Sequence, residues 1–140
     1  MPSKLSTTIK KIDALPNREN SDLIRQFHKF MISNGSSERH QNNNLKAIIS
    51  FANYLGSRAS FFNITTATEI LAFLDTKIKS RELDPDQKWI TTWNDYLHRI
   101  KHFLRWLLNT LFDRRSLPME DRKTPGFLQI KEKRTRTKKI

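Results

Sequence analysis

The segment from Asp84 to Phe112 places apolar residues at intervals of three and four over many consecutive helical turns. This spacing puts them on one face of a helix. Asp84 is a favourable N-cap residue and Pro85 suits the first helical position. No other proline or glycine occurs before Asp113, so the segment predicts a single long amphipathic helix. Its inner stripe consists of Trp89, Trp93, Leu97, Ile100, Leu104, Leu107 and Leu111, widened by Tyr96, Phe103 and Leu108.

Three shorter amphipathic segments precede this helix. The first runs from about Asn20 to Ser33, with Asn20 or Ser21 as its cap, and stops at Asn34-Gly35. The second runs from about Ser36 to Leu55 and ends at Gly56. The third starts at Thr66, where Thr66-x-x-Glu69 predicts a capping box, and ends near Ser80. The predicted buried stripes are Leu23, Ile24, Phe27, Phe30 and Met31; Gln41, Leu45, Ile48, Ile49, Ala52 and Leu55; and Ile70, Leu71, Phe73, Leu74 and Ile78.

The remaining segments complete a one-domain organisation. Residues 1–16 form a short amphipathic arm ended by Pro16, and we expect this arm to dock on the body. Phe61, Phe62 and Ile64 are expected to plug the core from the loop 57–65. Residues 113–140 form a basic linker or tail, broken by Pro118 and Pro125-Gly126. No strand-like alternation occurs, so the sequence predicts an all-α fold with a helical domain over residues 17–112.

The charge of the chain favours a polyanionic partner. The 140 residues include 26 Lys and Arg against 14 Asp and Glu, a net charge of +12. Such a charge suits DNA, RNA or an anionic membrane surface, and does not by itself distinguish them. No apolar run approaches the roughly 20 residues of a membrane span, and the N-terminus lacks a signal-peptide core. The chain has no cysteine, which fits a reducing interior, and we expect a cytoplasmic, nucleoid-associated protein.

Two basic helix faces are candidate binding surfaces. On the long helix, Lys and Arg can meet phosphates while Asn, His or Thr can meet base edges. The alternative is an ordinary solvated face, since Asp95 and Arg99 form an i,i+4 pair there. On the helix 36–55, a shorter row matters only if that helix lies beside the long one, so that the two basic faces merge. The two rows are Thr91, Asn94, His98, Lys101, His102 and Arg105, and Arg39, Asn43 and Lys46.

Catalytic and metal chemistry find no matching pattern. His98 and His102 have i,i+4 spacing, but no third ligand that completes a zinc site is close in sequence. The carboxylates are scattered, and no serine sits in a Gly-x-Ser-x-Gly turn. We therefore predict no catalytic residue, no metal and no cofactor. Trp106 falls on the outward side of the long helix, either under a lid formed by Phe127, Leu128 and Ile130 or as a contact for another domain.

The order of these features resembles a known family. A helix ending in Asn-Gly is followed by a Ser-capped helix, a loop, a long helix and a proline-containing segment before a basic run. Over residues 17–134 this is similar to the N-terminal core-binding domain of tyrosine recombinases (phage-type integrases), most closely the archaeal integrase-like members. Each motif is degenerate, and the resemblance rests on their order and spacing. The motifs are Tyr54-Leu55-Gly56, Ile64-Thr65-x-Ala67-Thr68-Glu69-x-x-x-Phe73-Leu74, Tyr96-Leu97-x-x-Ile100-Lys101-x-Phe103-x-x-Trp106-Leu107 and Thr124-Pro125-x-Phe127-x-x-Ile130-Lys131.

The resemblance implies a compact four-helix orthogonal bundle of the SAM-like type, with the short N-terminal arm and the basic C-terminal tail attached. In that family this domain forms half of a clamp around double-stranded DNA, with its second and fourth helices facing the duplex. The DNA-facing role carries over to residues of both basic helix faces, and the basic run adds further candidates by its charge. The residues are Arg39, Asn43, Lys46, Lys88, Thr91, His98, Lys101 and Arg105, with Arg134, Arg136 and Lys138 in the basic run.

The chain departs from the family in one large respect. The chemistry of that family needs a C-terminal domain with an Arg/Lys/His/Arg set and a nucleophilic tyrosine, which the residues after Phe112 cannot supply. We therefore expect a non-catalytic DNA-binding fragment whose catalytic domain would follow in cis, with self-association on DNA left open. A natural stand-alone accessory protein is the alternative origin. Two rival functions remain, a helical protein-interaction module anchored on Trp106 and an RNA-binding helical domain.

Overall fold

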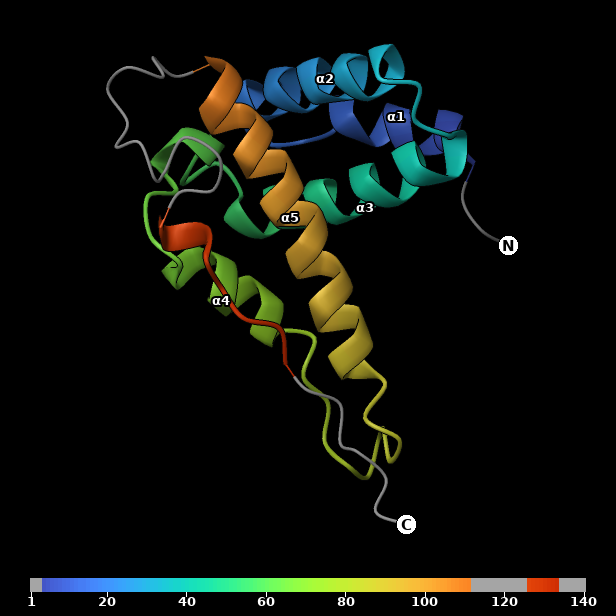
Figure 1. The fold of residues 1–140 in the computed structure, drawn as a ribbon, viewed down its shortest axis with the longest axis vertical. Helices are drawn as coiled ribbons and strands as arrows, with labels where there is room; N and C mark the ends of the chain where they lie inside the picture. Colours follow the sequence, from blue (N-terminus) through green and yellow to red (C-terminus); the bar gives the residue numbers. More distant parts are fainter. Residues whose placement is uncertain (1–3, 112–125, 134–140) are drawn as a thin grey trace.

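The computed structural model describes residues 4–111 and 126–133, and all regular secondary structure in these ranges is helical (Figure 1). The prediction of an all-α chain is confirmed for this part. No helix in these ranges is long and apolar enough to cross a membrane. The elements are α1 (Leu5–Asp13), α2 (Arg18–Ser33), α3 (Glu38–Leu55), α4 (Thr68–Asp75) and α5 (Trp89–Leu111), with two short 3-10 helices, η1 (Phe61–Asn63) and η4 (Gly126–Leu128).

Helix α3 is the centre of the bundle, because it packs against α1, α2 and α5. Its side chains are buried on several sides, and Leu45, Ile48 and Phe51 are fully inaccessible to solvent. Helix α5 crosses this group and reaches α4 (Figure 1). The inner stripe predicted for α5 is confirmed from Trp93 to Leu107, so a broad apolar face of this helix fixes which side remains for solvent.

An aromatic cluster joins the helices at the core. The rings of Phe61 and Phe103 lie 4.7 Å apart in an edge-to-face arrangement, and those of Phe27 and Phe103 lie 5.2 Å apart. Such edge-to-face pairs stabilise a core beyond the area they bury. Phe61 comes from η1 and Ile64 follows it, and both are buried. The prediction that the loop 57–65 plugs the core is therefore confirmed.

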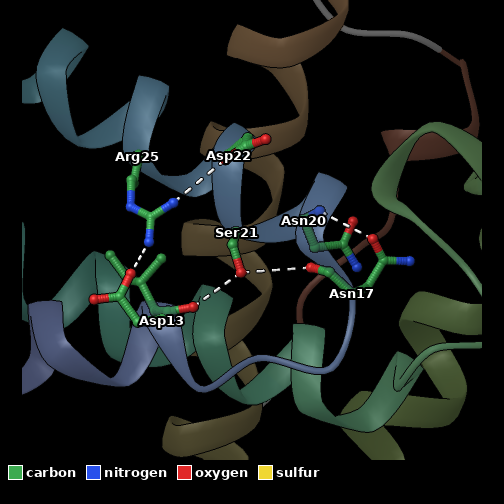
Figure 2. Close-up of polar contacts among 7 residues, drawn as sticks. Asp13, Asn17, Asn20, Ser21, Asp22 and Arg25 are labelled. Atoms are coloured by element: carbon green, nitrogen blue, oxygen red, sulfur yellow. Dashed lines mark hydrogen bonds and ion pairs between the residues drawn. The ribbon is translucent and has the colours of Figure 1, made fainter.

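Polar side chains fasten the start of α2 to its neighbours (Figure 2). The side chain of Asn17 accepts from the backbone N–H of Asn20 at 3.2 Å and caps the helix. The predicted caps Asn20 and Ser21 were wrong, because both side chains are buried and used elsewhere. Asn20 Oδ1 accepts from the N–H of Phe61 at 2.8 Å, and Ser21 Oγ donates to the carbonyl of Ile12 at 2.9 Å. These bonds tie η1 and α1 to α2, so the arm docks on the body as expected.

Helices α3 and α4 differ from their predicted ends. Helix α3 begins at Glu38 rather than Ser36, with Ser37 as its cap. Helix α4 begins at Thr68, after Ala67, and ends at Asp75 instead of near Ser80. The capping box at Thr66 was wrong because both carboxylate oxygens of Glu69 bind Arg58 at 3.0 Å, a charge-assisted pair. Ile78 lies beyond the helix and is 46% exposed, so its predicted burial was also wrong.

The start of α5 is later than predicted. Gln87 adopts φ of 54°, which is incompatible with a right-handed helix, and the regular helix begins at Trp89. Asp84 still acts at this end, because its Oδ2 accepts from the backbone N–H of Trp89 at 2.8 Å. The predicted start, with Asp84 as N-cap and Pro85 as the first helical residue, was therefore wrong, although the Asp84 side chain still binds the first turn. The polar face of α5 therefore begins after Lys88.

Candidate nucleic-acid interface

The predicted polar row on α5 lies on one face of the helix. Thr91, His98 and Arg105 are exposed, and Asn94 and Lys101 are half-buried. The exposed Lys88 precedes α5, and its carbonyl accepts from the N–H groups of Thr91 and Thr92. The structure therefore brings together the α5 half of the predicted site.

The α3 side of this surface is made by other residues than those predicted. His40 and Asn44 from α3 line an open hollow of about 350 Å³ with five residues of α5. Asn44 Oδ1 accepts from Arg99 at 2.8 Å, and Arg99 also forms the expected pair with Asp95 at 3.0 Å. Arg99 therefore links α5 to α3 through its bond to Asn44. The α5 residues of the hollow are Asp95, His98, Arg99, His102 and Arg105.

Arg39, Asn43 and Lys46 face a different neighbour. They line a separate open hollow with Lys4, at the start of α1. On a helix, successive residues are turned by roughly 100°, so this row points away from the line of His40 and Asn44. The two predicted basic faces therefore do not merge through these three residues, so the condition that would give this row more weight is not met by them.

A C-terminal strap, residues 126–133, covers much of the polar face of α5. It runs down between α4 and α5 in Figure 1, where it is drawn in red. Its backbone binds two of the predicted residues. Asn94 donates to the carbonyl of Lys133 at 2.7 Å and accepts from its N–H at 2.8 Å, and Lys101 Nζ donates to the carbonyl of Ile130 at 2.6 Å. The face proposed to meet nucleic acid is therefore already occupied in part by this chain.

A side-chain pair adds to the strap's hold. His98 Nε2 lies 2.7 Å from Oε2 of Glu132, with both side chains more than half exposed. The strap and α5 together enclose an open hollow of about 730 Å³. Because His98 also lines the hollow between α3 and α5, the two hollows adjoin at this residue.

Apolar and aromatic contacts anchor the strap. Leu128 is fully buried in the core, and Phe127 and Ile130 pack against it. The ammonium of Lys133 lies 4.9 Å from the centre of the Trp93 ring, a favourable cation–π distance. The apolar spacing of residues 127, 128 and 130 was visible in the sequence, but it could not show which side of α5 they would cover.

Trp106 is explained by α2 rather than by the strap. It is only 9% exposed, and its ring lies 5.3 Å from that of Phe27 and 5.9 Å from that of Phe30. The predicted outward position was wrong because α2 packs over this side of α5. The expectation of a lid over Trp106 made by Phe127, Leu128 and Ile130 is replaced by these α2 contacts.

Burial and crowded positive charge lower two pKa values on this surface. Burial is the larger cause for Lys101, whose pKa falls further through Arg105 and is partly restored by Glu132. Burial also lowers the pKa of His102, with Arg105 and His40 adding to the effect. Arg105 is therefore close to both Lys101 and His102, and an anion bound between these side chains would relieve the crowding of positive charge.

The lowered pKa of His102 predicts acid sensitivity of the fold. Below the ordinary histidine pKa of about 6.5 the unfolded chain binds a proton that the folded chain resists. The free energy of unfolding is therefore expected to fall as pH drops from 7.5 to 5.5. His102→Phe, which keeps an aromatic ring 5.4 Å from that of Phe27, should reduce this dependence. Urea unfolding at both pH values measures it, and an equal pH dependence in the two proteins would contradict the assignment to His102.

His98 faces Glu132 and the ring of His102 packs against Phe27, so the two imidazoles have different partners. Among the described residues, no group of three or more His, Asp or Glu side chains could hold a metal ion. Arg134, Arg136 and Lys138 lie outside the described residues.

Comparison with known proteins gives no match: no protein-family model fits the chain, and neither the curated proteins nor the solved structures include a significant relative.

Proposed function

We propose that this chain is a DNA-binding helical module, the core-binding domain of a site-specific tyrosine recombinase, that takes part in DNA recombination or integration. The observation that carries the proposal is the cationic face of α5, where Arg105 lies close enough to Lys101 and His102 to add to the lowering of both pKa values by burial. His40 adds to this charge from α3. A phosphate backbone is the ligand that such a surface fits best.

The proposed roles follow from the chemistry of each side chain. Lys101 and Arg105 would contact phosphates, while Thr91 and Asn94 would reach base edges. Arg39, Asn43 and Lys46, in their hollow beside α1, would meet a separate stretch of backbone. Arg134, Arg136 and Lys138 would track the duplex further. In this proposal α2 to α5 correspond to a SAM-like four-helix bundle, and the recombination chemistry belongs to a catalytic domain in cis.

A protein-interaction module is supported less well, because its expected anchor Trp106 is only 9% exposed. Leu83, 80% exposed between α4 and α5, is an apolar side chain that remains available to a partner. A single exposed leucine is ordinary for a folded protein. An RNA-binding role uses the same charges, so competition between duplex DNA and duplex RNA of equal length separates the two.

Salt dependence tests the DNA-binding proposal directly. We expect a dissociation constant on the order of 10⁻⁴–10⁻⁶ M near physiological salt, which falls steeply as salt is lowered. Fluorescence anisotropy of a labelled 20–30 base-pair duplex, at about 50 mM and 200 mM salt, measures how log K for association changes with the log of the salt concentration. We expect a slope of roughly −0.9 per neutralised phosphate. An affinity that does not change with salt concentration, or no binding at about 50 mM salt, would overturn the proposal.

A further inference from the structure

The strap presents to α5 the two chemical features of a nucleotide. Glu132 places a carboxylate 2.7 Å from His98, and this carboxylate partly offsets the lowering of the Lys101 pKa that burial causes. A DNA phosphate bound to His98 and Lys101 would occupy the same kind of anion position. Glu132 is therefore an internal anion beside His98 and Lys101, and it is the one acidic side chain among the described residues that line the hollow under the strap.

The neighbouring residue supplies a counterpart of a base edge. Asn94 accepts from the N–H of Lys133 at 2.8 Å and donates to its carbonyl at 2.7 Å. An asparagine that reads adenine in the major groove uses the same pair, accepting from N6 and donating to N7. While the strap is bound, both groups of the Asn94 amide are thus satisfied by backbone.

The strap is anchored at one end and exchangeable at the other. Leu128 is fully buried, so releasing it would expose a complete apolar side chain. The Glu132 and His98 side chains are 58% and 56% exposed. Exposed ion pairs contribute little to stability, with measured values of about 0–1 kcal/mol. Releasing residues 130–133 while Leu128 stays in the core also breaks the bonds of Asn94 and Lys101 and the contact of Lys133 with Trp93, so duplex DNA has to replace these interactions.

We propose that Glu132 and Lys133 fill the position of a nucleotide on the surface of α5. Duplex DNA then binds by displacing residues 130–133 from Asn94, His98 and Lys101. This inference rests on the proposed DNA-binding function and adds a competing segment to it. The strap lowers the affinity of the free protein for DNA, and Glu132 opposes an incoming phosphate. On binding, a DNA phosphate replaces the Glu132 carboxylate, and a base edge replaces the Lys133 backbone at Asn94.

Glu132→Gln in the full chain tests the exchange. It removes the competing anion and is expected to tighten duplex binding about three- to tenfold at low salt, given the energies of such exposed pairs and the repulsion relieved. Glu82→Gln is the matched control, because Glu82 is exposed in the loop between α4 and α5 and its loss changes the net charge equally. We expect less than about a twofold change for this control.

A second measurement reports the displacement itself. The backbone N–H of Lys133, bonded to Asn94 in the free protein, should exchange faster with solvent when saturating duplex is added. Hydrogen exchange followed by NMR measures it, with the N–H of Phe61, bonded to buried Asn20, as an internal reference.

The outcomes separate this inference from the DNA-binding proposal. If neither the unmodified protein nor Glu132→Gln binds duplex at low salt, the DNA-binding function is wrong and the inference fails with it. If both proteins bind, but Glu132→Gln gains no more than Glu82→Gln or the Lys133 N–H stays protected, the function stands and the displacement is overturned. Binding by Glu132→Gln that exceeds both other proteins, with faster Lys133 exchange, supports the displacement.

Discussion

Alanine at both Lys101 and Arg105 is expected to weaken duplex binding about a hundredfold at low salt. Charge-assisted contacts of this kind contribute on the order of 1.5 kcal/mol each, and each 1.4 kcal/mol is a tenfold change in affinity. The slope of log K against log salt should become shallower by roughly two, because two phosphates are no longer neutralised. Anisotropy titration of the same duplex at several salt concentrations measures both quantities.

Arg18→Ala with Lys29→Ala is the matched control. It also removes one Lys and one Arg, but from exposed positions on α2 that line neither hollow beside α5. We expect this pair to change affinity by less than about threefold, through long-range charge alone. An equal loss in both double variants would mean that net charge, rather than the α5 surface, determines binding.

Arg105→Ala alone separates the loss of a phosphate contact from the loosening of the strap. Lys101 also donates to the carbonyl of Ile130, so its removal loosens the strap as well as losing a phosphate contact. Arg105 lines the hollow between α3 and α5 and not the one beneath the strap. About half of the double variant's loss in free energy is therefore expected from Arg105→Ala.

Phe27→Ala is expected to destabilise the protein by about 3–5 kcal/mol. Phe27 is fully buried, and its ring contacts Phe103, Trp106 and His102 at centroid distances of 5.2, 5.3 and 5.4 Å. The truncation leaves a cavity where α2 meets α5, beneath the cationic face. Because domains of this size have only about 5–15 kcal/mol of stability, the variant should be partly unfolded well below the melting temperature of the unmodified protein.

Thermal and urea unfolding followed by circular dichroism measure this loss. Ile32→Ala serves as the control, because Ile32 lies on the same helix and is 54% exposed. We expect a change of about 0.5 kcal/mol or less there, as is usual for surface substitutions. Similar losses at the two positions would contradict the packing of α2 over Trp106.

The apolar stripes were predictable because helical periodicity alone decides which residues share a face. The stripe of α5 was identified in this way and is buried from Trp93 to Leu107, whereas the plug at Phe61 was predicted from the large apolar residues of its loop. Helix ends were predicted less well, because a side chain such as Glu69 can either cap its own helix or bind a residue distant in sequence. Arg58 is eleven positions away, and only the tertiary structure brings it within 3.0 Å.

The candidate site shows the same division. That Asn94, His98, Lys101 and Arg105 share one face follows from their spacing on a helix. His40 lies beside them and Arg39 does not. This difference depends on which side of α3 meets α5. Arg39 and Lys46 instead line the open hollow beside the start of α1.

By itself the sequence determined an all-α chain, the inner face of its long helix and a strongly cationic character, because these depend on composition and on a period of 3.6 residues. Tertiary structure alone decided that α2 covers Trp106 and that the strap lies across Asn94, His98 and Lys101. The physical reason is that these contacts join segments far apart in the chain. Their free energy depends on how whole faces fit together, which local patterns do not encode.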